Sequence, residues 1–212
     1  MPRAMEHGGV LGALLKASKA IDTFGRWTSR IAVWLVLISA LLSAANAFFR
    51  YFINELVYLA GTQDRFGVLQ AILSWYGQNS NAFLEAQWYM FGVMALLGAA
   101  YTLKVNEHVR VDLIYGWVSE RTRTWIDLFG GVLCLLPMCA MLAYLTWPWF
   151  VDSWFSGEVS TNAGGLVRWP AKLILPVGFA LIFLQGISEI IKCIAVLTSN
   201  YTREHAYEQP LQ

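Results

Sequence analysis

Four long apolar runs constrain the fold of this chain more than any other feature. They cover residues 31–49, 86–103, 128–151 and 173–188, and the charged residues gather between them. Crossing about 30 Å of hydrocarbon takes roughly 20 apolar residues, and flanking Trp, Tyr and Lys side chains can extend the two shorter runs. The sequence therefore predicts an all-α integral membrane protein with four transmembrane helices, at about 31–53, 84–104, 126–151 and 171–196.

The composition and the distribution of charge agree with this interpretation. Hydrophobic residues make up 57% of the chain and charged residues 14%, whereas a soluble domain carries about 25% charged residues. Lys and Arg concentrate before the first run and between the second and third, which favours cytoplasmic termini and external loops at 54–84 and 152–170. The chain then divides into a cytoplasmic segment 1–30, a membrane domain 31–198 and a tail 199–212. The net charge of +1 argues against nucleic acid as a partner.

Two segments outside the predicted spans have amphipathic helical spacing. Apolar residues recur every three or four positions from Leu11 to Trp27, which predicts a basic helix in the cytoplasmic interface; a solvated tail is the alternative. In the first external loop Phe66, Leu69 and Ile72 share one helical face. We expect a short helix there, on the outer membrane surface or against a partner.

The first run also permits a different interpretation. Residues 45–47, Ala-Asn-Ala, resemble a signal-peptidase site. A long basic stretch precedes the run and Phe48 and Phe49 continue it, so an uncleaved first span is the expectation.

Small and polar residues form stripes on the first two spans. Such stripes mark helix–helix contacts, because small residues permit close approach and polar side chains hydrogen-bond across the contact. The second span carries small residues four apart at Ala95/Ala99 and Gly98/Thr102, and Pro137 and Pro176 predict kinks in the third and fourth. The stripe on the first span, at i, i+4, i+7 and i+11, consists of Ser39, Ser43, Asn46 and Arg50.

Motifs for catalysis or cofactor binding are missing from the sequence. His7, His108 and His205 all lie outside the spans, so a membrane cytochrome with paired histidine ligands is excluded. The sequence has no nucleotide-binding, zinc-protease or nucleophile-elbow motif and no Cys-x-x-Cys. We expect a protein that is not an enzyme and holds no cofactor or metal.

Ionisable residues lie at the ends of the predicted spans. Arg50 ends the first and Glu85 opens the second, so an ion pair between them is one hypothesis and two independent interfacial charges the other. Glu189 precedes Lys192 by three residues in the fourth span, which favours a local pair over a carboxylate that couples transport to an ion. A self-contained carrier would need a charge deep in the membrane, and none lies there.

The cytoplasmic loop contains an alternating polar pattern over residues 108–112. His108, Arg110 and Asp112 fall on one side of an extended segment. An Arg between an imidazole and a carboxylate can form a hydrogen-bonded cluster that orders the loop. An ordinary positively charged cytoplasmic loop is the alternative.

Taken in order, these pieces resemble the small membrane subunit of tripartite ATP-independent periplasmic (TRAP) transporters. The resemblance covers roughly residues 25–195 and departs from the family in a longer connection at 53–82. Its pieces are Arg50-Tyr51-Phe52, Glu85, Leu97-Gly98-Ala99-Ala100, residues 108–112 and Leu175-Pro176-Val177-Gly178-Phe179.

The resemblance implies a scaffold in the lipid of the bacterial inner membrane. Its expected partners are a large multi-span subunit, which holds the substrate and sodium sites, and a periplasmic binding protein that delivers an organic acid. Arg50, Glu85, Gly98, Pro176 and the cytoplasmic-loop cluster would then be structural or subunit contacts. The outer-face contacts would be Phe66, Leu69, Ile72, Trp154 and Arg168. The rival is a free-standing four-span adaptor, or a small ion-coupled carrier that acts as a homo-oligomer.

Overall fold

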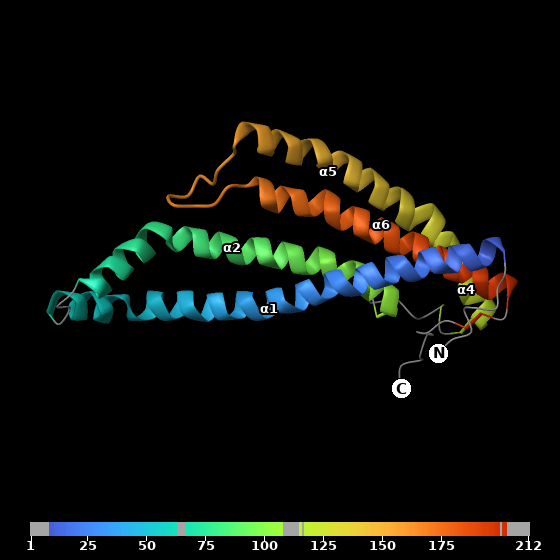
Figure 1. The fold of residues 1–212 in the computed structure, drawn as a ribbon, viewed down its shortest axis with the longest axis horizontal. Helices are drawn as coiled ribbons and strands as arrows, with labels where there is room; N and C mark the ends of the chain where they lie inside the picture. The colour runs from blue at the N-terminus through green and yellow to red at the C-terminus, as the bar shows by residue number, and fades with distance from the viewer. Residues whose placement is uncertain (1–8, 63–66, 108–114, 116, 200, 203–212) are drawn as a thin grey trace.

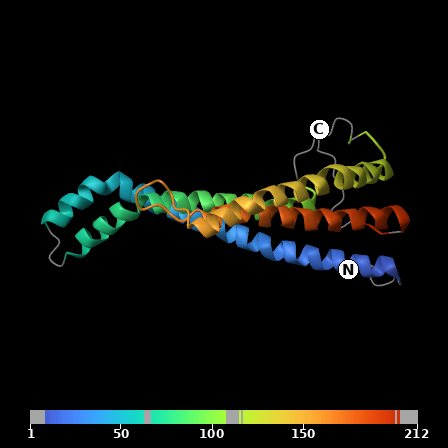
Figure 2. The same ribbon diagram turned by 90° about the horizontal axis from the view of Figure 1, so that it is seen from above.

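The chain folds into two long antiparallel helical hairpins that lie side by side (Figures 1 and 2). A computed structural model describes residues 9–62, 67–107, 115, 117–199 and 201–202. The first hairpin joins α1 to α2, and the second joins α5 to α6. The helix α4 and a π-helical turn, η1, lead directly into α5. The bounds are α1 Val10–Thr62, α2 Val68–Val105, α4 Glu120–Gly130, η1 Gly131–Leu135, α5 Leu136–Ser156 and α6 Trp169–Thr198.

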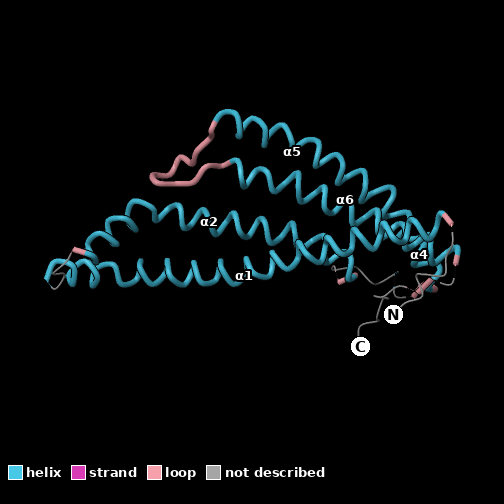
Figure 3. Tube along the Cα trace, in the orientation of Figure 1, coloured by secondary structure: helices cyan, strands magenta, loops and turns pink. Residues whose placement is uncertain are grey.

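The expected all-α membrane architecture is confirmed. Four helical stretches are long and apolar enough to cross a membrane: α1, α2, α6 and the continuous stretch Glu120–Ser156. Figure 3 shows that these four stretches are helical along their length and that the connection between α5 and α6 is not helical. In the described part of the chain, the only pairing of strand type is a bridge between Val159 and Val167 in that connection.

The N-terminal segment is not a separate interfacial helix. Residues 11–27 form the first turns of α1, which continues unbroken to Thr62 and is about 80 Å long at 1.5 Å per residue. Gly25 has the lowest helix propensity of the residues near the expected break, and it lies where a Cβ would be 3.3 Å from the Gln185 side chain. Close packing against α6 therefore stabilises the helix through this point.

The face of this segment that is buried also differs from the prediction. Leu14, Phe24 and Trp27 of the expected apolar face are exposed. The buried residues are instead mostly small or polar, and they point toward α6: Gly12, Leu15, Ser18, Asp22, Gly25 and Thr28. Large apolar side chains outside and small polar ones inside are the arrangement of a helix surrounded by lipid.

The short outer-face helix is likewise part of a longer element. The chain from Val68 continues without a break past Gly77 into the second span, which makes α2 38 residues long. Gly67 at its N-cap and Asn106 at its C-cap both have left-handed backbone angles, with φ of 66° and 62°. A single residue in the left-handed conformation commonly ends a helix. No residue between Val68 and Val105 has a positive φ, so the helix is not interrupted there. How much of each helix lies in the bilayer stays a prediction.

The π-helical turn precedes Pro137 directly. A proline has no N–H and its ring collides with the carbonyl four residues earlier, which for Pro137 is that of Leu133 in η1. Widening the helix there by one residue relieves the collision, and π-turns of this kind commonly mark such points. The structure thus has a π-turn next to Pro137, and the predicted kinks at Pro137 and Pro176 stay predictions.

The helices pack around α6. The most extensive contacts are between α1 and α2 and between α5 and α6, and α6 also contacts α1, α2 and α4. A small apolar cluster at the end of the bundle that holds the termini joins α1 to α6 through Leu15, Ile191 and Ala195. The helix α5 packs on α6 from the outside (Figure 1).

Candidate functional site

Two buried polar clusters connect the helices, one near each end of the bundle. The first, which we call the α2–loop cluster, is centred on Glu85 and ties α2 to the connection between α5 and α6. The second, the α1–α6 cluster, is centred on Asp22 and Lys192. Both lie within this chain, so they bear first on how the bundle is held together.

Glu85 accepts hydrogen bonds on both carboxylate oxygens from the α5–α6 connection. Oε1 accepts from the Ser160 hydroxyl and from Asn162 Nδ2 at 2.9 Å, and Oε2 accepts from the backbone N–H of Leu166 at 2.7 Å. The side chain is buried. Hydrogen bonds to a charged acceptor are about twice as strong as neutral ones, so this carboxylate fixes the connection on α2.

The neighbouring turns of α2 add two more contacts. Asn81 and Tyr89 lie four residues to either side of Glu85 and therefore on the same face of the helix. Asn81 Nδ2 donates to the Ala163 carbonyl at 2.9 Å, and the Tyr89 hydroxyl donates to the Val167 carbonyl at 3.1 Å. Three consecutive turns of α2 thus hold the connection.

The connection has a backbone shape that fits against α2. The backbone N–H of Ser160 donates to the Leu166 carbonyl at 3.0 Å and that of Arg168 to the Glu158 carbonyl at 2.9 Å. Gly164 has a φ of +68°, and a Cβ there would lie 1.9 Å from the Gln78 carbonyl oxygen. Only glycine combines that angle with so close an approach.

An ion-pair group borders this cluster at the start of α6. The Glu158 carboxylate contacts Lys172 and lies 3.9 Å from Arg168, and the hydrogen bond from Lys172 lowers the pKa of Glu158. Lys172 Nζ also lies 4.6 Å from the centre of the Trp149 ring. These contacts join the end of α5 to the first turn of α6.

The predicted ion pair between Arg50 and Glu85 does not form among the described residues. Glu85 is occupied by the α5–α6 connection, and Arg50 is exposed on α1. The contact between α1 and α2 at this level is made by Asn46, whose Oδ1 accepts from the Tyr76 hydroxyl at 2.6 Å. The hypothesis of an Arg50–Glu85 ion pair is therefore wrong, and Glu85 contacts the α5–α6 connection instead.

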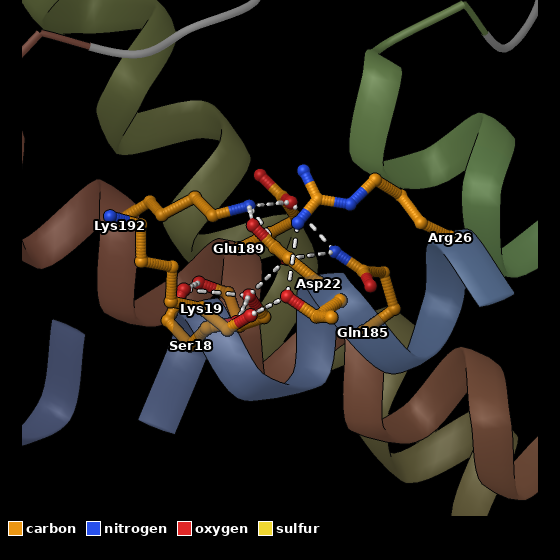
Figure 4. A network of polar contacts seen from close by, with 9 residues as sticks. Ser18, Lys19, Asp22, Arg26, Gln185, Glu189 and Lys192 are labelled. Atoms are coloured by element: carbon orange, nitrogen blue, oxygen red, sulfur yellow. Dashed lines mark hydrogen bonds and ion pairs between the residues drawn. The ribbon is translucent and has the colours of Figure 1, made fainter. Parts of the chain in front are cut away.

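In the α1–α6 cluster, one ammonium group bridges two carboxylates (Figure 4). Lys192 Nζ lies 2.8 Å from Asp22 Oδ2 and 2.7 Å from Glu189 Oε1. Gln185 Nε2 donates to both acids at 3.0 Å. The local Glu189–Lys192 pair is therefore present, and it is part of a larger group that includes Asp22 from α1.

Two serine hydroxyls extend this cluster along the helix contact. The Ser188 hydroxyl donates to Asp22 Oδ1 at 2.8 Å and lies 2.7 Å from the Ser18 hydroxyl. Ser18, Ser188 and Gln185 are almost completely buried. Sequence reasoning missed Asp22, which lies off the apolar face predicted for residues 11–27. The spacing of Ser18, Asp22, Gly25 and Thr28, a second stripe of small and polar residues, is the signal that could have found it.

The other predicted contact residues lie in several environments. Ser39 and Asn46 are buried on α1, Ser43 is half-buried and Pro176 is buried on α6. Gly98 is half-buried with free space where a Cβ would be. Of the expected outer-face contacts, Leu69 and Arg168 are half-buried and Ile72 and Trp154 are exposed. The remaining predicted residues lie outside the described residues: Phe66, His108, Arg110 and Asp112.

The geometry of both clusters suits helix packing. Within the described ranges, no group of three or more His, Cys, Asp or Glu side chains is arranged to hold a metal ion. Glu85 and Asp22 accept hydrogen bonds from another element of the chain, and Glu189 accepts from Gln185 and Lys192 of its own helix. Burying such charges without partners would cost several kcal/mol, and here they are paired.

Comparison with known proteins places this architecture in a family. Residues 67–196 match the family described as "Tripartite ATP-independent periplasmic transporters, DctQ component". The "C4-dicarboxylate TRAP transporter small permease protein DctQ" of Pseudomonas aeruginosa (strain PAO1) is 27% identical over 108 residues, which is 50% of each chain. The aligned part of the chain thus spans about half the length of that relative. No solved structure matches. The family match includes α2 with Glu85, the α5–α6 connection that Glu85 contacts, and α6 through Glu189 and Lys192. The chain belongs to the DctQ family, the small, non-enzymatic membrane component of TRAP transporters.

Proposed function

We propose that this chain is the scaffold subunit of a sodium-coupled, binding-protein-dependent TRAP transporter in the bacterial inner membrane. A large multi-span subunit would carry the substrate and sodium sites, and a periplasmic protein would deliver the substrate. We infer an organic acid as substrate, and the name of the Pseudomonas relative, a C4-dicarboxylate transporter component, favours a dicarboxylate.

The observation that carries this proposal is where the buried charges lie. Glu85 and the Asp22–Glu189–Lys192 group are each paired inside the chain near opposite ends of the bundle. Between Glu85 and this group, the buried side chains that the structure describes on α1 and α6 are uncharged, and the buried charge on α2 besides Glu85 is Lys104, in the last turn of that helix. A chain that moves ions or acids by itself would need ionisable groups along a path through the membrane. A rigid supporting bundle needs only paired groups that fix its helices.

The proposal is tested by purifying the tagged chain in mild detergent and identifying every co-purifying protein by mass spectrometry. We expect a larger multi-span protein in one-to-one ratio with this chain. A chain that elutes only as a homo-oligomer would contradict the proposal and favour the free-standing carrier.

A variant with one exposed charge removed tests whether the association is specific. Glu55→Gln changes an exposed acid of α1 and should leave both the yield and the co-purifying protein unchanged. If this variant lost the partner, the association would reflect general charge and not a specific complex.

A further inference from the structure

An apolar groove runs between α5 and α6 on the outside of the bundle. Its volume is about 370 Å³, and its walls consist of short aliphatic side chains, proline rings and two aromatic rings. Pro148 lies on one side and Pro176 on the other. The lining residues are Ala143, Tyr144, Trp147 and Pro148 of α5 with Pro176, Val177 and Ala180 of α6.

The position of the groove indicates what kind of molecule can fill it. The helix α5 packs only on one side, and Tyr144, Leu145 and Trp147 are exposed. In a helix that spans the bilayer, these side chains face lipid. If the groove between α5 and α6 stayed empty, the residues on its walls would lose dispersion contacts. An acyl chain is the flexible apolar group that surrounds the protein at this depth.

Charged residues lie at the end of the groove nearest the α5–α6 connection. On α6, Arg168 precedes Pro176 by eight residues, which is about 12 Å along a helix, and half of the hydrocarbon thickness is about 15 Å. A lipid headgroup near Arg168 would therefore have its acyl chain at the depth of the groove. The exposed tryptophan rings of Trp149 and Trp154 are typical of this interfacial level.

The charges at this level match a zwitterionic headgroup. Arg168 has 41% of its side chain exposed and only a long, 3.9 Å contact to Glu158, so its guanidinium can still bind a phosphate. It also precedes the N-terminus of α6, where the helix dipole favours an anion. On α5, the exposed Asp152 lies one turn beyond Pro148 on the same face and can accept from an ammonium group.

We propose that the groove between α5 and α6 binds one acyl chain of an outer-leaflet phospholipid whose phosphate contacts Arg168 and whose ammonium group contacts Asp152. The bound lipid fills the space that the two prolines leave and supports the otherwise one-sided packing of α5. This inference depends on the helices spanning a membrane and is independent of the proposed role as a scaffold.

Native mass spectrometry of the tagged chain, purified together with its partners and supplied with dipalmitoyl phosphatidylethanolamine, tests the proposal. Ala180→Phe places a ring in the groove and should remove one retained phospholipid. Leu145→Phe, which places a ring at an exposed position of α5 outside the groove lining, should retain as many as the wild type. Arg168→Gln should weaken retention about threefold, as expected for an exposed ion pair.

The headgroup assignment has its own control. Asp152→Asn should weaken retention of phosphatidylethanolamine and leave that of phosphatidylglycerol, which has no ammonium group, unchanged. An unchanged number of retained lipids in Ala180→Phe would overturn the proposal. So would the loss of a protein partner from that variant with the lipids retained, because the groove would then seat a helix of the partner.

Discussion

Glu85 is the single residue on which the α2–loop cluster depends. Its two oxygens face only donors, namely Ser160, Asn162 and the Leu166 N–H. Glu85→Gln keeps the shape but turns an NH₂ group toward one set of these donors. Losing charged hydrogen bonds of this kind costs about 2 kcal/mol, so we expect a lower free energy of unfolding in detergent. Glu55→Gln, on an exposed position, should leave stability within about 0.5 kcal/mol; equal effects of the two changes would contradict the assignment.

Lys192 should be the most sensitive residue of the α1–α6 cluster. Lys192→Met leaves the carboxylates of Asp22 and Glu189 buried near each other without a cation, and breaking a buried pair from one side costs about 3–5 kcal/mol. Adding Asp22→Asn to Lys192→Met removes one of the uncompensated charges and should recover part of that loss. A double-mutant cycle on unfolding free energies measures this coupling, and purely additive effects would show that the two residues do not interact.

Sequence reasoning at this scale found the residue types but not their partners. Glu85 was singled out because it opens the second predicted span near the end of the first, but its donors come from 75 or more residues away in a connection with no regular pattern. Asp22 was not singled out because it lies off the apolar face predicted for residues 11–27. In a water-soluble bundle the apolar face of a helix points inward, whereas in a bundle surrounded by lipid the stripe of small and polar residues does. The periodicity of residues 11–27 therefore indicates the opposite buried face.

The α5–α6 connection is the element whose conformation the structure constrains most. Gly157 and Gly164 both have positive φ, but only Gly164 also lies against another backbone, that of Gln78. Gly157→Ala should therefore cost only the strain of the left-handed conformation, about 1–2 kcal/mol. Gly164→Ala must also displace the connection from α2. We expect faster hydrogen exchange across residues 158–168 in Gly164→Ala than in Gly157→Ala; equal rates would mean that the connection is not held by this contact.

Helix number was predictable, whereas helix length was not. Hydropathy sets where a helix can cross a bilayer, and the four runs were evident. It does not report where a helix ends, and nothing in residues 22–31 or 76–84 stops one: Gly25 packs against α6 and Gly77 lies within α2. As a result, the two amphipathic segments predicted at residues 11–27 and 66–72 are not separate helices: the first belongs to α1, and the described part of the second belongs mainly to α2.

At the scale of the whole molecule, the charge distribution predicts one orientation. The start of α1, the end of α6 and α4 lie at one end of the bundle, and the α5–α6 connection lies toward the other (Figure 1). In a variant without the native cysteines, a single cysteine at Thr161 should react with a membrane-impermeant maleimide in spheroplasts, and one at Ser119 should react only after lysis. The reverse pattern would show that the positive-inside assignment is wrong.

The central claim is that this chain supports transport without carrying the substrate. Uptake of labelled C4-dicarboxylate into sodium-gradient proteoliposomes tests it most directly, with this chain alone compared with this chain plus its co-purifying large subunit and binding protein. We predict no uptake above empty vesicles for the chain alone and sodium-dependent uptake for the complete set. Sodium-dependent uptake by this chain alone would contradict the account.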